Sequence, residues 1–370
     1  MKGNRFNLIF LSFMIFIILI SCESNNNAIK TKNDKILIEL GKTQKEISFV
    51  FTSLPQERKI RKWKKIKMEY KYKIGGIEDT TLYFPTRIKT DSLNNIYVLD
   101  SKDCCVKKFN KDGRYLSKIG KKGNGPGEFI TPSKFDVRPN GKVAILDPNL
   151  NKCVIFDGEK TYLIKSRFNP IDVCFVSEDE VVLLQVISVI EDSFLRKYNY
   201  KTNQLNEYNN IIDIEKHSKL VLGAFPPLQG YILNNDKKLL YVPKFIKSFL
   251  LYDKNGIIEN GFKTMKDDND KILENSAISL SDFRIPNKFR SLIDATLLEN
   301  KLIIWDYQKS IENKKTSFDF YNASNGKYLY SVQIILKDAE TKISTVYFTK
   351  SNIYVLNDKS ELEVYEYRIL

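Results

Sequence analysis

The chain carries a loosely repeated unit, and residues 84–129 form its clearest copy. This copy contains three short runs rich in β-forming residues, NIYVLD, CVKKFN and RYLSKIG, which are separated by Asn, Asp and Gly turn signals. It ends in a loop rich in Gly and Pro, GKKGNGPGEF, and a new Pro then begins the next copy. Units of this kind bury their apolar residues by packing each copy against the next.

One signature, an aromatic residue followed by a turn residue in the third run, identifies six copies. The aromatic residues lie 47, 42, 54, 69 and 44 positions apart, which brackets the roughly 40 to 50 residues of a propeller repeat. The longest interval predicts an insertion at residues 263–290, as a long loop on one face. The second runs are apolar on both sides, as expected where blades stack, so we interpret the aromatic residues as core. These aromatic residues are Phe109, Phe156, Tyr198, Tyr252, Tyr321 and Tyr365.

The sixth copy stops after its third run, so the last blade would lack a fourth strand. The segment MEYKYKIG, residues 68–75, matches RYLSKIG of the first full unit and lies just before that unit. A propeller closes its ring or leaves a strand edge exposed. We therefore expect residues 68–75 to complete the sixth blade.

The best copy resembles the NHL family of β-propeller repeats. In that family a Pro-led strand precedes a yVaD-like strand, a vFd.dG-like strand and a GkkGsGpGeF-like loop. The corresponding pieces here are Phe84 with Pro85, then residues 97–100, 108–113 and 120–129. The resemblance is specific for residues 84–157 and implies an all-β, six-bladed β-propeller with four-stranded blades. We expect this single domain to span residues 61–370.

The N-terminus has the pattern of a bacterial lipoprotein leader. Lys2 and Arg5 precede an apolar run, residues 8–20, which is too short for a comfortable membrane span. The run ends in Leu-Ile-Ser-Cys, which looks like a lipobox with acylation at Cys22; an ordinary signal peptide is the alternative. We expect residues 1–21 to be a signal peptide and residues 22–60 a lipidated tether, which would hold the protein on a membrane of the cell envelope, more often the outer one.

The chain is basic, with 59 Lys and Arg residues (57 once Lys2 and Arg5 are removed) against 45 Asp and Glu. Because Lys is dispersed along the chain and the leader predicts export, we expect no nucleic-acid partner. Cys104, Cys105, Cys153 and Cys174 fit no zinc spacing. They can be buried thiols or form disulfides.

Residues that would indicate catalysis are scarce. His217 is the only histidine, which removes most mechanisms and metal sites based on His. The loop that contains Pro126 lacks a following GK[ST], so it is not a P-loop. Asp267, Asp268 and Asp270 lack the Gly and Glu offsets of a calcium loop. We expect no catalytic set, metal or cofactor; the alternative is a metal-dependent hydrolase or lyase that uses the central channel.

A candidate ligand site follows from where the blades begin. Pro85, Pro132 and Pro170 each open an innermost strand, and a charged residue stands two positions later. Equivalent positions of successive blades lie around one ring, so these charges should converge at a channel mouth, to bind an anionic or polar ligand or to pair with one another. The candidate residues are Arg87, Lys134 and Asp172, followed by Lys89, Asp136 and Arg138 on the same strands.

These observations predict a membrane-anchored, monomeric binding protein. The ligand of such a propeller would be a protein, a peptide or a glycan, an expectation that rests on analogy between folds.

Overall fold

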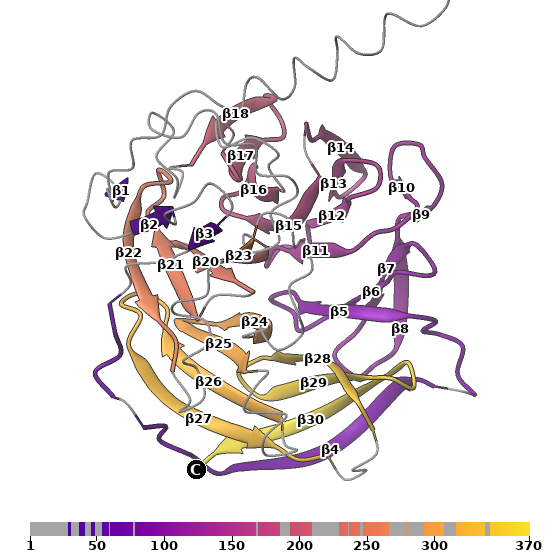
Figure 1. The fold of residues 1–370 in the computed structure, drawn as a ribbon. Helices are drawn as coiled ribbons and strands as arrows, with labels where there is room; N and C mark the ends of the chain where they lie inside the picture. The colour runs from indigo at the N-terminus through magenta and orange to yellow at the C-terminus, as the bar shows by residue number, and fades with distance from the viewer. Residues whose placement is uncertain are drawn as a thin grey trace, which may run out of the picture.

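The computed structural model describes residues 54–370, except 59, 77, 168, 186–192, 209–228, 236, 245–246, 266–277, 280–291, 307–315 and 337–340. It also describes short strands within residues 29–48 and at 278–279. Six four-stranded antiparallel sheets are arranged in a ring (Figure 1). The predicted six-bladed β-propeller is therefore confirmed.

Each blade runs outward from a first strand at the channel. Blade one contains β5 (Pro85–Thr90), β6 (Ile96–Asp100), β7 (Cys105–Phe109) and β8 (Tyr115–Ile119), and blade two contains β11 (Lys134–Val137), β12 (Val143–Asp147), β13 (Lys152–Asp157) and β14 (Lys160–Lys165). Blade three contains β15 (Pro170–Phe175), β16 (Glu180–Gln185), β17 (Leu195–Asn199) and β18 (Gln204–Glu207), and blade four contains β19 (Gly230–Asn234), β20 (Leu239–Pro243), β21 (Ser248–Tyr252) and β22 (Ile258–Lys263). Blade five contains β24 (Leu292–Leu298), β25 (Lys301–Asp306), β26 (Thr316–Asn322) and β27 (Tyr328–Ile334), and blade six contains β28 (Ile343–Phe348), β29 (Asn352–Asn357), β30 (Glu361–Ile369) and β4 (Ile66–Gly75).

Stacking of the blades explains why the second strands are apolar on both sides. Every residue of β6, β12 and β20 is buried. One cluster joins blade one to blade two, with Tyr97 and Leu99 packed near Phe135 and Ile145. Four of the six signature aromatics are buried, and the other two pack partly buried against these clusters. The core interpretation of the aromatic series is therefore confirmed.

The two ends of the propeller meet in blade six. β4 pairs antiparallel with β30 from Ile66 opposite Ile369 to Gly75 opposite Glu361. Ile74 is 5% exposed and belongs to the cluster between blades six and one. The predicted closure by an N-terminal strand is confirmed.

The chain before β4 runs along blades four and five. Leu54 bridges to Phe262 of β22, and Trp63 bridges to Ser331 of β27. The contacts begin at Leu54, within the segment for which the sequence predicted a tether. Between the two bridges Arg61 is buried, and we call residues 54–65 the strap.

Acidic residues at the ends of two second strands hold the chain as it enters each blade. Asp100 accepts hydrogen bonds from the backbone N–H groups of Tyr83 (2.7 Å) and Phe84 (3.0 Å). Asp147 accepts them from Ile130 (2.7 Å) and Thr131 (3.0 Å). Both carboxylates are fully buried, so the Asp of the yVaD-like run satisfies backbone donors that no strand pairs.

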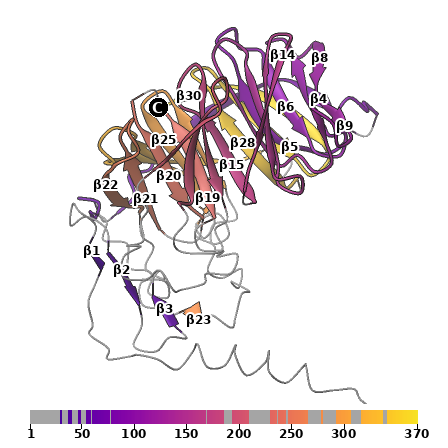
Figure 2. The same ribbon diagram turned by 90° about the horizontal axis from the view of Figure 1, so that it is seen from above.

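A small sheet lies outside the ring of blades (Figure 2). It contains β1 (Ile29–Lys30), β2 (Leu37–Leu40), β3 (Glu46–Ser48) and β23 (Ile278–Ser279). The apolar patch of the tether thus forms strands, and β23 is the part of the predicted insertion that pairs with it. The rest of the insertion beyond Met265, and Cys22 and His217, lie outside the described residues.

The cysteines of the blades lie in the core. Cys104, Cys105 and Cys153 are buried thiols, and Cys174 is buried as well. Cys104 precedes β7 in a left-handed conformation with a φ of 54°, whereas Cys105 is the first residue of that strand. Burial raises the pKa of the Cys105 thiol to about 12, which makes it unreactive at neutral pH.

Candidate functional site

The first strands of all six blades place one side chain each around the channel. Blade by blade, this residue pairs with the penultimate residue of the second strand, as Arg87 does with Leu99 and Asp172 does with Leu184. In four blades the strand pairing shifts register just before this residue, and the shift turns its side chain into the channel. We call these six residues the inner ring: Arg87, Lys134, Asp172, Tyr231, Asp294 and Thr345.

The inner ring lines a small cavity of about 50 Å³. Its cations and anions approach each other without forming close ion pairs. Arg87 Nη1 lies 3.9 Å from Asp294 Oδ2, and Lys134 Nζ lies 3.9 Å from Asp172 Oδ1. The Lys134 ammonium also lies over the Tyr231 ring, 4.2 Å from its centroid. Opposite charges thus offset one another across the channel.

Burial shifts the pKa values of charged groups in the inner ring. Burial and the neighbouring positive charge of Arg87 together lower the pKa of Lys134 to about 8, against the opposing effect of Asp172. Burial also raises the pKa of Asp172, although Lys134 and a hydrogen bond from the Ile232 N–H (2.9 Å) oppose that shift. These shifts are typical of ligand-binding sites and also of buried ion-pair networks.

The next layer along the channel contains a closer pair. Lys89 Nζ lies 3.0 Å from Asp136 Oδ1, and the other oxygen of Asp136 accepts a hydrogen bond from the Phe175 N–H at 2.9 Å. Burial opposes the charge on Lys89, but Asp136 outweighs that effect and raises the pKa of Lys89. Lys89 is therefore a cation at neutral pH.

Beyond this layer the channel widens into a cavity of about 480 Å³, which we call the outer cavity. Most of its polar lining comes from the turns that follow the first strands. Besides Lys89 and Asp136, the lining includes two cations, three amides, one carboxylate and one phenol: Arg138, Lys237, Asn234, Asn235, Asn300, Glu299 and Tyr347. A cavity of this volume is within the range of small-ligand sites.

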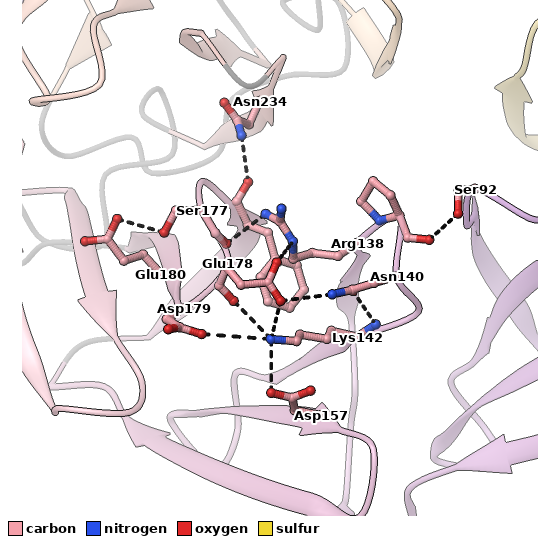
Figure 3. Close-up of polar contacts among 12 residues, drawn as sticks. Ser92, Arg138, Asn140, Lys142, Asp157, Ser177, Glu178, Asp179, Glu180 and Asn234 are labelled. Atoms are coloured by element: carbon pink, nitrogen blue, oxygen red, sulfur yellow. Dashed lines mark hydrogen bonds and ion pairs between the residues drawn. The ribbon is translucent and has the colours of Figure 1, made fainter.

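A hydrogen-bonded network builds one wall of the outer cavity (Figure 3). Arg138 Nη1 donates to the Ser177 carbonyl (2.7 Å), and Asn234 donates to the Phe175 carbonyl (3.0 Å). Behind them Lys142 Nζ lies 2.6 Å from Glu178 Oε1 and 3.0 Å from Asp157 Oδ2 (Figure 3). Burial lowers the pKa of Lys142, but these two carboxylates outweigh it and raise the pKa. The network fixes the turns of blades two, three and four against one another.

All six residues that the sequence placed at a ligand site lie along the channel. Arg87, Lys134 and Asp172 form half of the inner ring, and the other three line the outer cavity. Sequence reasoning missed the other half of the ring, because blades four to six do not begin with Pro. The last residue of a second strand could have located two of the missed residues. Leu292 and Ile343 each pair with the last residue of a second strand, and the ring residues Asp294 and Thr345 stand two positions after Leu292 and Ile343.

Among the residues that the structure describes, no group of three His, Cys, Asp or Glu side chains could hold a metal ion. In the same part of the chain, no helix is long and apolar enough to cross a membrane.

Residues 78–252 match the model of a family described as a 6-bladed beta-propeller (DUF5128). None of the curated proteins matches the chain. Together with the six blades of the structure, the family match defines the chain as a six-bladed β-propeller protein.

Two solved structures share this fold at low identity. One is a candidate exported protein from Bacteroides fragilis NCTC 9343, with 14% identity and a TM-score of 0.55 over 86% of this chain and 99% of the other. The second is a member of the DUF4221 family from Bacteroides vulgatus ATCC 8482, with 9% identity and a TM-score of 0.58 over 82% and 98% of the two chains. The match to virginiamycin B lyase from Staphylococcus aureus has 13% identity and a TM-score of 0.49, and it covers 81% of this chain and 99% of the lyase chain.

Proposed function

We propose that the protein is a binding protein of the bacterial cell envelope, anchored by a lipid on Cys22, and that its ligand occupies the outer cavity without being chemically changed. The observation that carries the proposal is the outer cavity itself, about 480 Å³ in volume, with a wall held by the network around Arg138 and Lys142. A fixed wall limits the conformational entropy that is lost when a ligand binds.

The chemistry of the lining supports a polar ligand. Asn235 and Asn300 contribute amides that both donate and accept hydrogen bonds, and Tyr347 adds a phenol beside them. Arg138 and Lys237 add two cations at the mouth. Peptides and glycans present the matching carbonyl and hydroxyl groups, so they are the ligand classes that we propose.

The binding role can be tested with an array of peptides and glycans, probed with the full-length protein in detergent. We expect Arg138→Met with Lys237→Met to weaken the bound probes about tenfold, which corresponds to about 1.4 kcal/mol. The free energy of unfolding should fall by no more than about 1 kcal/mol. Lys121, whose side chain is 70% exposed in the segment between blades one and two, supplies the matched control Lys121→Met. Equal binding by the double variant and the parent would contradict the proposed site.

The anchor is tested separately. We expect Cys22→Ala to abolish incorporation of a fatty-acid analogue, because the thiol of Cys22 is the proposed attachment point. Labelled protein is measured after immunoprecipitation from cells, with Cys104→Ala as a control that keeps the lipobox. Equal labelling of Cys22→Ala and the parent would overturn the lipid anchor.

The site and the anchor are supported by separate features. The outer cavity is built from blades one to six, whereas the lipobox precedes the strap by about thirty residues. The propeller would therefore be held near the membrane with its channel available for a ligand. One of the two similar solved structures, a candidate exported protein from Bacteroides fragilis, supports an extracytoplasmic location.

A further inference from the structure

Two cations of the inner ring carry donors that no described residue accepts. Lys134 Nζ lies 3.9 Å from Asp172, which is too far for a hydrogen bond, and its other contact is the face of the Tyr231 ring. Arg87 Nη1 donates to the Thr86 carbonyl (2.9 Å) and to Thr345 Oγ1 (3.1 Å), but its Nε is buried without an acceptor in the described part of the chain. A buried donor without an acceptor, such as Arg87 Nε, costs free energy, so the cavity favours a group that accepts hydrogen bonds.

The charges around the inner ring determine which acceptor fits. Arg87 and Lys134 belong to adjacent blades, and both line the 50 Å³ cavity. Asp172 and Asp294 also line it and offset two positive charges. A monoanion can use both cations, whereas a dianion would meet stronger repulsion from the two carboxylates in a site of low dielectric. The ring therefore favours a carboxylate over a doubly charged phosphate or sulfate.

The size of the cavity and its neighbour limit the ligand further. One water molecule needs about 10 to 15 Å³ of such volume, so 50 Å³ accommodates a group of only a few atoms. Lys89, Leu233 and Tyr347 line both this cavity and the outer cavity, so the two adjoin along the channel. A ligand whose end enters the inner ring would have its remaining atoms in the outer cavity.

We infer that the inner ring binds one carboxylate group, held between Arg87 and Lys134, as the end of a ligand whose polar body fills the outer cavity. This inference rests on the proposed function and names the chemistry of its ligand. Thr345 is a positioning residue, because its hydroxyl accepts from Arg87 and donates to Asp294 at 3.2 Å. An acidic sugar or the C-terminus of a short peptide has the required carboxylate.

The test is titration calorimetry on the full-length protein in detergent at constant ionic strength, with acetate, formate, inorganic phosphate and sulfate as probes. We expect saturable, millimolar binding of acetate and formate, and at least tenfold weaker binding of phosphate and sulfate. Arg87→Met and Lys134→Met should each weaken acetate binding at least tenfold, whereas Lys121→Met should leave it unchanged. Replacement of Lys134 by Met removes a desolvated charge but also the cation that lies 3.9 Å from the buried Asp172, so the melting temperature of each variant is measured to keep loss of binding distinct from unfolding.

Binding should also depend on pH. The groups that face Lys134 are Arg87 from β5, Asp172 from β15, Tyr231 from β19, Asp294 from β24, and Lys244 after β20. Its pKa is lowered to about 8, so it loses its proton, and the ring one positive charge, as the pH rises through that value. We expect acetate affinity to fall between pH 7 and pH 9 in the parent, and the residual binding of Lys134→Met to stay constant over that range.

Three results would overturn the inference: no saturable binding of acetate to the folded protein, equal affinity for phosphate and acetate, or unchanged acetate affinity in both ring variants. The array experiment separates this inference from the proposed function. If peptides or glycans bind through Arg138 and Lys237 while acetate does not bind, only the carboxylate inference fails. If acetate binds at the ring but no array probe binds, the proposed function fails and the ring is a site for small anions alone.

Discussion

A chain that lacks residues 23–75 is expected to aggregate or to melt at least about 10 °C below the parent, whereas a chain that lacks residues 23–53 should remain soluble with nearly the parental melting temperature. The longer deletion removes β4, which pairs with β30 along its length. It also removes Ile74 and Met68, and so uncovers the apolar residues of the two clusters against which they pack. The loss of buried apolar area lowers the free energy of unfolding by several kcal/mol, and each kcal/mol lowers the melting temperature by about 2 to 4 °C, which gives the expected shift.

The two deletions differ by the strap and β4, so they form a matched pair. Melting is followed by circular dichroism, and the oligomeric state by size-exclusion chromatography, since the exposed edge of β30 can pair with another copy. Identical melting and elution of the two truncated chains would show that β4 is not needed to close the ring.

Replacement of Arg61 by Ala is expected to lower the free energy of unfolding by about 3 to 5 kcal/mol. Arg61 Nη2 lies 2.8 Å from Asp306 and 3.0 Å from Asp319, and its Nε donates to Asp319 at 3.0 Å. The three side chains are 5%, 6% and 2% exposed, so the substitution leaves two buried carboxylates without their principal cation. Urea unfolding measures the change.

Arg58 provides the control, because it is an exposed arginine in the same strap. Arg58→Ala should change stability by no more than about 0.5 kcal/mol. A double variant, Arg61→Ala with Asp319→Asn, should recover part of the loss because it removes one uncompensated charge. If Arg61→Ala unfolds like Arg58→Ala, the strap contributes little to the propeller.

The fold was largely predictable because it repeats. Blades that stack need second strands that are apolar on both sides, and this pattern located β6, β12, β16, β20, β25 and β29. The match between residues 68–75 and a fourth strand located the closing strand for the same reason. The strap left no such signal, since it is extended and its key residue, Arg61, finds its partners on β25 and β26, about 250 positions away.

The site was predictable in part. A Pro at the start of a first strand fixes the backbone, so Arg87, Lys134 and Asp172 could be placed around one channel. The distances between their side chains depend on neighbouring blades, and no spacing within one repeat contains that information. For the same reason the sequence did not show that Lys89 and Asp136 form a close ion pair, that Lys134 lies 3.9 Å from Asp172, or that Arg87 Nε is buried without an acceptor among the described residues.

The pairing of β4 with β30 also sets the order in which the protein can be completed. Lys73 and Glu361, which form an ion pair across these strands, are 288 positions apart, so β4 is synthesised long before its partner. During that time β4 is an unpaired strand, and contacts that are so distant in sequence form slowly. Its solvent-facing residues include Lys67, Glu69 and Lys71, and such charges oppose pairing with another chain. The charged residues of β4 therefore protect this strand from pairing with other chains until its partner β30 has been synthesised.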